Sequence, residues 1–367
     1  MRRLGAVAHL TVLLLAAAIS ASGAPFQWPE GGPDMAIDAT TKAQVILSLV
    51  SELRRAYVFP DVGDKVADTV EKSQRAGAFN SITSAKGLRD ALNREMADVA
   101  HDLHLHVLYS SEVLPPDPPP GQTAPPLDPQ TLSELGKANY DFEDARRLEG
   151  NIGYLKMTGF MGAGIGGPTL AAAMEFLSRT DALIIDLRDN SGGYPSMVAL
   201  LASYFFRSGI PVHLNDLESR NRGTKEYTLT QWWVFPYVPG PRYVDREVYI
   251  LTSHETPSAA EEFCYDLQTQ KRATVVGETT WGGANPGDVI RLGDHFQVFM
   301  PTGHAINPIT KTNWEGVGVK PDIEIPQQEA LKAAQKAALE HLIAKSSNAK
   351  DSDLLRQDLA HLNSTAP

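Results

Sequence analysis

Ser258 is the first candidate for chemistry, because it lies between the apolar segment 248–252 and a helical pattern that begins near Pro257. A helix N-terminus offers free N–H groups and positive potential, so a nucleophile placed there would have oxyanion donors beside it. The same spacing fits a helix cap. Ser258 with Glu261 would form a capping box, whereas Thr256 with Pro257 would cap the helix earlier and leave Ser258 free. Spacing alone leaves both interpretations open.

A second turn, residues 188–193, follows the apolar segment 182–187 and ends in Gly192 and Gly193. Paired glycines let the backbone turn sharply and expose N–H groups that can receive a developing oxyanion. A tight turn without chemistry is the plainer interpretation of the glycine pair alone. In open α/β sheets ligands bind where strands end, so the two turns together predict a site.

A serine hydroxyl needs a base, and histidine suits that role near neutral pH. The candidates are His104 and His106, in the segment 101–108, and His254, four residues before Ser258. Glu315, in a glycine-punctuated loop, is a candidate carboxylate for orienting the base, and an exposed loop carboxylate is the alternative interpretation.

Polar and apolar residues alternate over residues 101–108, which predicts a strand with Asp102, His104 and His106 on one face. Two imidazoles on one face could also hold a metal ion. Because no further ligand motif accompanies them, we predict no metal and no cofactor.

The elements that must position these residues fall into two regions. Helical patterns at 41–57, 66–75 and from Ser84 to Val99 predict a small helical N-terminal domain at 36–110. A proline-rich stretch, 111–139, predicts an extended linker.

After the linker, residues 140–328 predict an α/β core whose parallel strands are covered on both faces. A C-terminal helix and tail follow at 329–367. The expected elements are strands at 152–157, 182–187, 248–252 and 273–276, helices at 168–178, 196–206, 257–268 and 330–344, and exposed antiparallel strands at 224–236 and 288–300.

Composition narrows the class of protein. The chain has 367 residues, and 43% of them are hydrophobic, which argues against a disordered chain. Its formal charge of −11 argues against a nucleic-acid partner, because phosphates attract positive charge. The single cysteine, Cys264, excludes an intramolecular disulfide and Cys-based zinc sites. Any nucleophile is therefore expected to be a hydroxyl.

Residues 1–24 have the pattern of an export signal. Arg2 and Arg3 precede an apolar stretch, 4–19, and small residues follow at 20–24. The apolar stretch is shorter than the roughly 20 residues that a spanning helix needs. We expect cleavage between residues 21 and 24, no stable membrane insertion afterwards, and a periplasmic or secreted protein.

Five motifs, in this order along the chain, carry a resemblance to a known family: residues 102–105, 187–193, 252–262, 276–280 and 316–322. Over residues 41–326 the chain resembles the S41 family of serine peptidases, which includes the C-terminal processing proteases, the tricorn core protease and the repeats of interphotoreceptor retinoid-binding protein. The resemblance implies an α/β fold with a crotonase/ClpP-like β/α spiral core. It also implies Ser258 as the nucleophile, with the N–H groups of Ala259 and of Gly192 or Gly193 as the oxyanion hole.

Two departures indicate the tricorn-like and retinoid-binding branch. Processing proteases use a lysine base, and the segment 281–285 has none; residues 111–150 are also too few for the PDZ domain of those enzymes. The tricorn-like branch uses a histidine and a glutamate, which match His104 and Glu315. Leu103 stands where tricorn has a linking serine, so a water, a direct contact or Asp102 could couple Glu315 to His104.

We therefore expect an exported serine-type peptidase, a hydrolase acting on peptide or protein substrates through an acyl-enzyme on Ser258. The alternative is a non-catalytic binding module that holds an apolar ligand or peptide between the two domains. The aromatic residues that could line such a site are Trp232, Trp233, Phe235 and Tyr237.

Overall fold

The computed structural model describes residues 28–116 and 127–364. The predicted export signal and part of the predicted linker lie outside these residues. Among the described residues, no helix combines the length and the apolar character needed to span a membrane.

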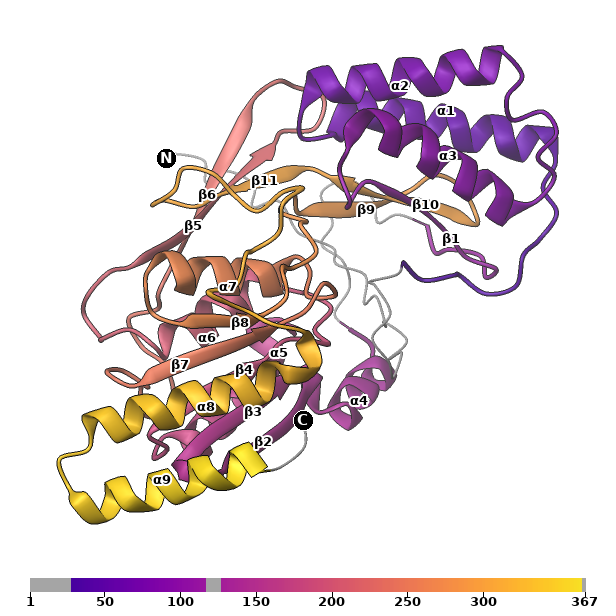
Figure 1. Cartoon of the computed structure of the whole chain (residues 1–367). Helices are drawn as coiled ribbons and strands as arrows, with labels where there is room; N and C mark the ends of the chain where they lie inside the picture. The colour runs from indigo at the N-terminus through magenta and orange to yellow at the C-terminus, as the bar shows by residue number, and fades with distance from the viewer. Residues whose placement is uncertain (1–27, 117–126, 365–367) are drawn as a thin grey trace.

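Three helices form the N-terminal region at the top of Figure 1, as the sequence predicts: α1 (Ala39–Ala56), α2 (Pro60–Arg75) and α3 (Ala85–Ala100). The side chain of Asp38 caps α1, and that of Ser84 caps α3. The buried faces of these helices form one apolar cluster.

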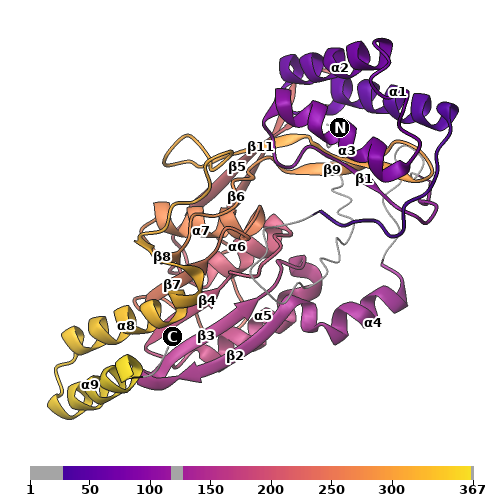
Figure 2. The same ribbon diagram turned by 45° about the vertical axis from the view of Figure 1, so that its right-hand side comes forward.

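This helical region is completed by strands from much later in the chain. β1 (His106–Tyr109) pairs with β10 (Phe296–Pro301), which pairs with β9 (Gly287–Arg291), all antiparallel. Apolar residues of the β9–β10 hairpin belong to the same cluster as the three helices. The predicted boundary between the two regions is therefore crossed by a shared core (Figures 1 and 2).

The predicted strand at 101–108 is wrong in its first half. The carboxylate of Asp102 accepts the backbone N–H of His104 at 3.0 Å, and this local bond makes a turn before β1 begins at His106. His104 therefore lies in a turn, which is packed against the core.

Helix α4 (Pro129–Lys137) lies inside the predicted linker, so that part of the linker prediction is wrong. Asp128 caps the helix by accepting the N–H groups of Gln130 and Thr131. The short helix η1 (Asn139–Asp141), strand β2 (Phe142–Leu148) and short helix η2 (Glu149–Asn151) follow.

A six-stranded sheet forms the core, in the order β12-β8-β7-β4-β3-β2. All neighbouring pairs are parallel except β2 with β3. The strands not yet located are β3 (Ile152–Met157), β4 (Ala182–Asp186), β7 (Glu247–Thr252), β8 (Thr274–Gly277) and β12 (Ile323–Glu324).

Helices cover both faces of this sheet (Figure 1). α5 (Ala163–Leu177), α6 (Pro195–Ser203) and α7 (Ala259–Thr269) pack on one face. α8 (Gln327–Lys345) and α9 (Ala349–Ser364) cover the other. The expected α/β core with a small helical N-terminal region is confirmed.

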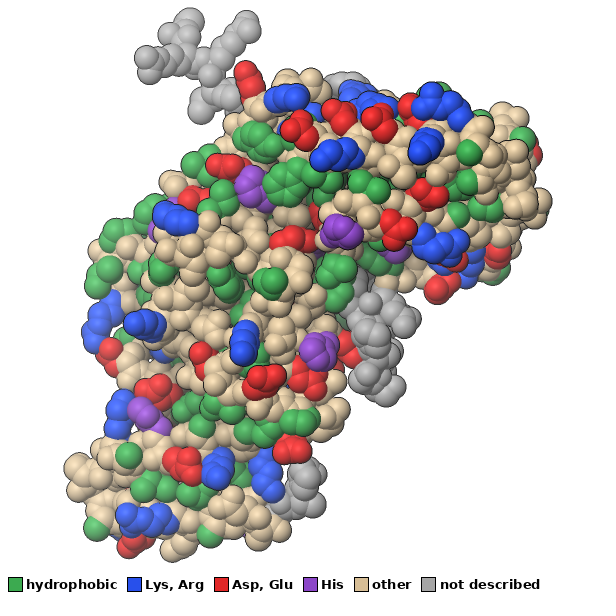
Figure 3. Space-filling view, turned by 45° about the horizontal axis from the view of Figure 1, so that its top comes forward, with side chains coloured by type: hydrophobic (Ala, Val, Ile, Leu, Met, Phe, Trp, Pro, Cys, Tyr) green, Lys and Arg blue, Asp and Glu red, His purple; other side chains and the backbone are tan. Residues whose placement is uncertain are grey.

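A third sheet, antiparallel in the order β11-β5-β6, lies beside α7. Its strands are β5 (His213–Arg220), β6 (Tyr227–Trp233) and β11 (Gly303–Ile306). The exposed antiparallel strand expected at 224–236 corresponds to β6. The segment 288–300 forms β9 and β10, but its apolar side chains are buried, so its expected exposure is wrong, and β5 and β11 are not predicted. Charged side chains of both signs are interspersed over the face in Figure 3, which shows no large basic patch.

The shared core predicts that the helical region and the β9–β10 hairpin unfold together. Phe296 is 1% exposed and packs on Tyr109 with ring centroids 5.8 Å apart. Phe296→Ala should lower the free energy of unfolding by about 3–5 kcal/mol, in a single transition measured by denaturant titration. Leu47→Ala, at a position 71% exposed on α1, is the control and should change it by less than about 0.5 kcal/mol. A separate early transition in the Phe296 variant would contradict the shared core.

Candidate active site

The two turns identified in the sequence meet at the carboxyl ends of neighbouring parallel strands, β4 and β7. The hydroxyl of Thr256 donates to the carbonyl oxygen of Leu187 at 2.8 Å, and that of Ser253 donates to the carbonyl oxygen of Arg188 at 2.5 Å. These two bonds tie one turn to the other. Because α7 begins at Ala259 with Ser258 at its N-cap, the interpretation of Thr256 as the cap of α7 is wrong.

Ser258 occupies the N-cap position of α7 with φ 54° and ψ −120°. A non-glycine residue in this region is strained, and such strain is concentrated at functional sites. The Glu261 carboxylate accepts the backbone N–H of Ser258 at 2.8 Å, which helps to hold the strained conformation. The cap and the candidate nucleophile are thus the same residue.

The glycine turn approaches Ser258 closely. Gly192 has φ 85°, and a Cβ added there would lie 3.0 Å from the Cβ of Ser258. Gly193 has φ 139°, and a Cβ there would lie 2.4 Å from the carbonyl oxygen of Phe160. Both positions therefore require glycine.

The backbone N–H groups of these two glycines differ in whether they have a hydrogen-bond acceptor. That of Gly192 donates to the side-chain oxygen of Asn190 at 2.8 Å. Among the described residues, the N–H groups of Gly193 and Ala259 have no hydrogen-bond acceptor. These two donors are therefore the ones available to an oxyanion.

His104 reaches this site from the helical region. Its ring stacks on Phe299 at 5.5 Å between centroids and meets the Trp281 ring edge-on at 5.0 Å. Burial lowers the pKa of His104 to about 4, so the ring is neutral at physiological pH. Gly283 leaves room for it, because a Cβ at that position would lie 2.5 Å from the Cε1 atom of His104.

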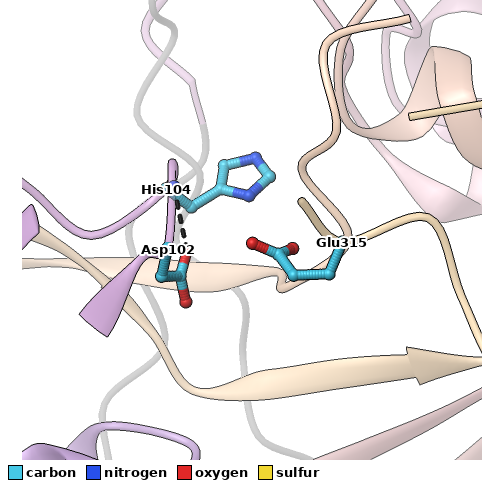
Figure 4. A group of neighbouring side chains, drawn as sticks. All are labelled: Asp102, His104 and Glu315. Atoms are coloured by element: carbon cyan, nitrogen blue, oxygen red, sulfur yellow. Dashed lines mark hydrogen bonds between the residues drawn. The ribbon is translucent and has the colours of Figure 1, made fainter. Parts of the chain in front are cut away.

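Glu315 and Asp102 lie beside the imidazole. One polar atom from each of Asp102, His104 and Glu315 lies within 4.8 Å of the others, and Figure 4 shows a ring nitrogen facing the Glu315 carboxylate. Nδ1 of His104 and Oε1 of Glu315 are both buried without a hydrogen-bond partner. Leu103 is 41% exposed, so its side chain does not bridge this pair.

The two carboxylates are held by neutral donors. Asp102 accepts hydrogen bonds from the Tyr57 hydroxyl, the Asn285 side-chain amide and the His104 backbone, each at 3.0 Å. Glu315 accepts the backbone N–H of Ala284 at 2.5 Å. Burial, together with the nearby Asp102 carboxylate, raises the pKa of Glu315 to about 8.

Glu261 joins the Ser258 turn to the loop that supports His104. Besides the N–H of Ser258, its carboxylate accepts hydrogen bonds from the Thr280 hydroxyl at 2.5 Å, from Gly282 N–H at 2.6 Å and from Gly283 N–H at 2.9 Å. Burial raises its pKa to about 7. The sequence marks Glu261 as a capping residue but gives no sign of these contacts with the loop.

A cavity of about 180 Å³ lies between the Ser258 turn, the glycine turn and the imidazole. Its lining brings Ser258, Ala259, Gly192, Gly193 and His104 together, although Glu315 lies behind the imidazole and is not part of the lining. Lining residues that the sequence does not single out include Trp28, Asp141, Asn215, Leu217, Glu262 and Phe299.

Other candidate residues lie elsewhere or play different roles. His254 is exposed and does not line the cavity. His106 faces the side-chain nitrogen of Asn93 at 2.9 Å and stacks on Trp28, so the described residues group His104 with two carboxylates rather than with His106. His104 and His106, which the sequence analysis considered as an alternative metal pair, therefore do not belong to one group of candidate ligands.

Of the four aromatic residues proposed for a ligand site, Trp232 lines the cavity. Phe235 packs against the main core. Trp233 stacks on His213, and Tyr237 is 75% exposed. The predicted aromatic cluster is therefore dispersed.

Comparison with known proteins gives two family matches. The profile of peptidase family S41 matches residues 151–325, and that of the N-terminal domain of this family in eukaryotic IRBP matches residues 39–141. A carboxy-terminal-processing protease of Bartonella bacilliformis is 27% identical over 186 residues, 49% of this chain and 40% of that protein. The chloroplastic carboxyl-terminal-processing peptidase 2 of Arabidopsis thaliana is 29% identical over 181 residues, 48% of this chain and 32% of that protein.

Solved structures show the same fold. A Parabacteroides merdae protein matches with a TM-score of 0.54 at 18% identity, over 84% of this chain and 98% of its own. A Streptococcus agalactiae lipoprotein matches with a TM-score of 0.53 at 15% identity, over 83% and 98%.

The packing of His104 against Gly283 generates a prediction. In Gly283→Ala the new methyl group would lie 2.4 Å from the Trp281 ring and 2.5 Å from the His104 ring, so both rings must shift. The pKa of His104 should then rise from about 4 toward 6.5 as its ring gains solvent. The variant should also lose about 1–3 kcal/mol of stability. An NMR titration of the His104 ring and thermal melting measure both effects. Gly164→Ala, where a methyl group meets open space, is the control, and an unchanged His104 titration in the Gly283 variant would contradict the contact.

Proposed function

We propose that this chain, which belongs to peptidase family S41, hydrolyses peptide bonds through an acyl-enzyme on Ser258, with His104 as the general base and Glu315 as its orienting carboxylate. The observation that carries the proposal is the single cavity that contains a strained serine, a neutral imidazole and two N–H groups without acceptors. Acyl transfer needs these three components together.

Histidine rather than lysine is proposed as the base because of the residues in and around the segment 281–285. The segment 281–285 has no lysine, and the rings of His104 and Trp281 occupy the volume that a side chain at Gly283 would need. An imidazole from the helical region thus reaches the cavity through the loop in which processing proteases are expected to carry their lysine. This arrangement supports the tricorn-like type of base.

The proposed reaction has two steps, acylation of the serine and hydrolysis of the acyl-enzyme. Ser258 Oγ attacks the substrate carbonyl carbon while His104 takes the hydroxyl proton, and the oxyanion faces the N–H groups of Ala259 and Gly193. Collapse of this intermediate breaks the C–N bond, and His104 gives the proton to the leaving amine. Water attacks the resulting ester as His104 takes its proton, and the acid product leaves with the serine hydroxyl restored.

Glu315 acts on the tautomer of the base. An ionised carboxylate facing His104 Nδ1 favours the proton on that nitrogen and leaves the other nitrogen free to accept from Ser258. Direct contact after a small shift, or one bridging water, would close the gap between Nδ1 and the unpartnered Oε1. Asp102 positions the His104 backbone through its hydrogen bond and is a positioning residue.

We further propose that the substrate is a peptide or protein met outside the cytoplasm, after removal of residues 1–24. The chain spans 40% and 32% of the length of the two relatives compared above. C-terminal processing is the activity that their names give, and for this chain it is a hypothesis. A binding module for an apolar ligand is the second candidate. The aromatic residues Trp28, Trp232, Trp281, Phe299 and Trp314 in the cavity lining favour it.

The first test removes the nucleophile. Ser258→Ala should abolish labelling by a fluorophosphonate and lower peptide turnover by at least about 10⁴-fold, while stability changes by about 1 kcal/mol, the scale of a lost cap. Mass spectrometry of the labelled peptide checks the site, and Ser253→Ala is the control serine in the same turn. Wild-type protein that resists the probe yet binds hydrophobic peptides would favour the binding module. Labelling that an excess of chelator abolishes would contradict metal-independent catalysis.

The second test concerns pH. Below a pKa of about 8 Glu315 carries a proton, so it has no charge to hold a proton on His104 Nδ1 and its own O–H can donate to that nitrogen. We therefore expect kcat/KM to rise with pH through that region, whereas an ordinary histidine base would give a limb near 6.5. Glu315→Gln should lose this limb and fall in kcat/KM on the order of 10³–10⁴-fold. A pH profile of substrate hydrolysis measures both. An unchanged limb in the variant would remove Glu315 from the mechanism.

A further inference from the structure

One face of the sheet β11-β5-β6 forms a wall of the cavity beside Ser258. Asn215 and Leu217 lie two residues apart on β5 and share this face. Their cross-strand neighbours, Trp232 on β6 and Ala305 on β11, also line the cavity. The wall is therefore apolar except for the Asn215 amide and the indole N–H of Trp232, which is buried without a hydrogen-bond partner among the described residues.

Glu262 faces this wall from α7, one turn after Ser258. It is 6% exposed and lines the cavity, and its carboxylate accepts a hydrogen bond from the Asn215 side-chain nitrogen at 3.1 Å. The amide oxygen of Asn215 is buried with no hydrogen-bond partner among the described residues, and Asn215 itself is 2% exposed. Two acceptors, a carboxylate and an amide oxygen, thus lie at one end of an apolar cavity.

The charged groups of the lining have one sign. Glu262 and Asp141 are its carboxylates, and the described lining includes no lysine or arginine. Behind Glu262 lies Asp266, another buried acid, whose neighbours include Asn307. Burial raises the pKa of Glu262 to about 7, which reflects the lack of a compensating cation.

We propose that this part of the cavity binds the basic side chain of a lysine or arginine adjacent to the scissile bond, with Glu262 as counter-charge and Asn215 as second acceptor. The aliphatic stem of such a side chain would pack on Leu217, Trp232 and Ala305, and its tip would donate to the two oxygens. A buried carboxylate costs stability unless it is paired, so a cationic substrate group supplies what the free protein lacks.

The same geometry disfavours other side chains. An acidic side chain would add a third negative charge to the lining. An apolar side chain would leave the Asn215 amide oxygen unpaired and the Glu262 carboxylate without a counter-charge, which costs binding free energy. An uncharged amide could donate to the same oxygens but would leave the Glu262 charge uncompensated. The test therefore compares charged and uncharged side chains of similar length.

The inference rests on the proposed hydrolase, so the experiment carries an independent readout of Ser258. Peptidyl diphenyl phosphonates that differ only in the recognised side chain, lysine, its uncharged analogue norleucine, or glutamine, are compared with a generic fluorophosphonate on the full-length protein. The lysine phosphonate should inactivate the wild type about 10- to 100-fold faster than the norleucine phosphonate, the scale of a hydrogen bond to a charged group. Glu262→Gln should reduce that ratio at least tenfold. Glu255→Gln, a neighbouring carboxylate outside the cavity lining, should keep it.

The outcomes separate the two proposals. Failure of the generic probe to label wild-type Ser258 would overturn the hydrolase and this inference together. Normal generic labelling with equal rates for lysine and norleucine, or with glutamine as fast as lysine, would overturn the basic specificity and leave the hydrolase standing. Generic labelling of Glu262→Gln shows that its site is intact, and a lysine preference unchanged in that variant would also overturn the assignment.

Discussion

The site depends on the four hydrogen bonds accepted by the Glu261 carboxylate. One fixes the backbone of Ser258, in a conformation that a serine rarely adopts, and the others fix the loop at Thr280, Gly282 and Gly283. Because His104 packs against that loop, a single buried carboxylate sets where the nucleophile and the base stand relative to each other. The further bonds of the loop, from the Trp314 ring to the Gly283 carbonyl and from Gly316 to the Gly282 carbonyl, make it a rigid support.

Desolvation explains most of the electrostatics. The buried carboxylates of Asp102, Glu261, Glu262 and Glu315 accept hydrogen bonds from amides and hydroxyls rather than ion pairs with lysine or arginine. Burial therefore raises the pKa of each, and it lowers that of His104. In the folded state these acids retain protons that the unfolded chain would release, so the folded state loses stability as pH rises toward 8.

Local patterns in the sequence are sufficient for the core and for part of the site. Continuous apolar runs predict the buried parallel strands, and helical periodicity predicts the covering helices, because both reflect burial along one segment. Strand β5 is missed, since its segment 213–220 carries several charged residues, and α4 is missed because prolines hide its pattern. The roles of Asn215, Glu262 and Asn285 depend on contacts between distant segments, which no local period encodes.

The base and the nucleophile stand beside different apolar clusters: β1 and β10, which pair with each other, both belong to the N-terminal cluster, whereas α7, with Ser258 at its N-cap, belongs to the main core. Among the described residues, β1 is the only strand of the N-terminal region that pairs with strands from after residue 127. A few ångströms of sliding between the two clusters would carry the imidazole away from Ser258 while leaving the serine and its oxyanion donors in place. A ligand that contacts both clusters, such as a long polypeptide, would therefore change the reactivity of Ser258 by fixing the position of the imidazole relative to it.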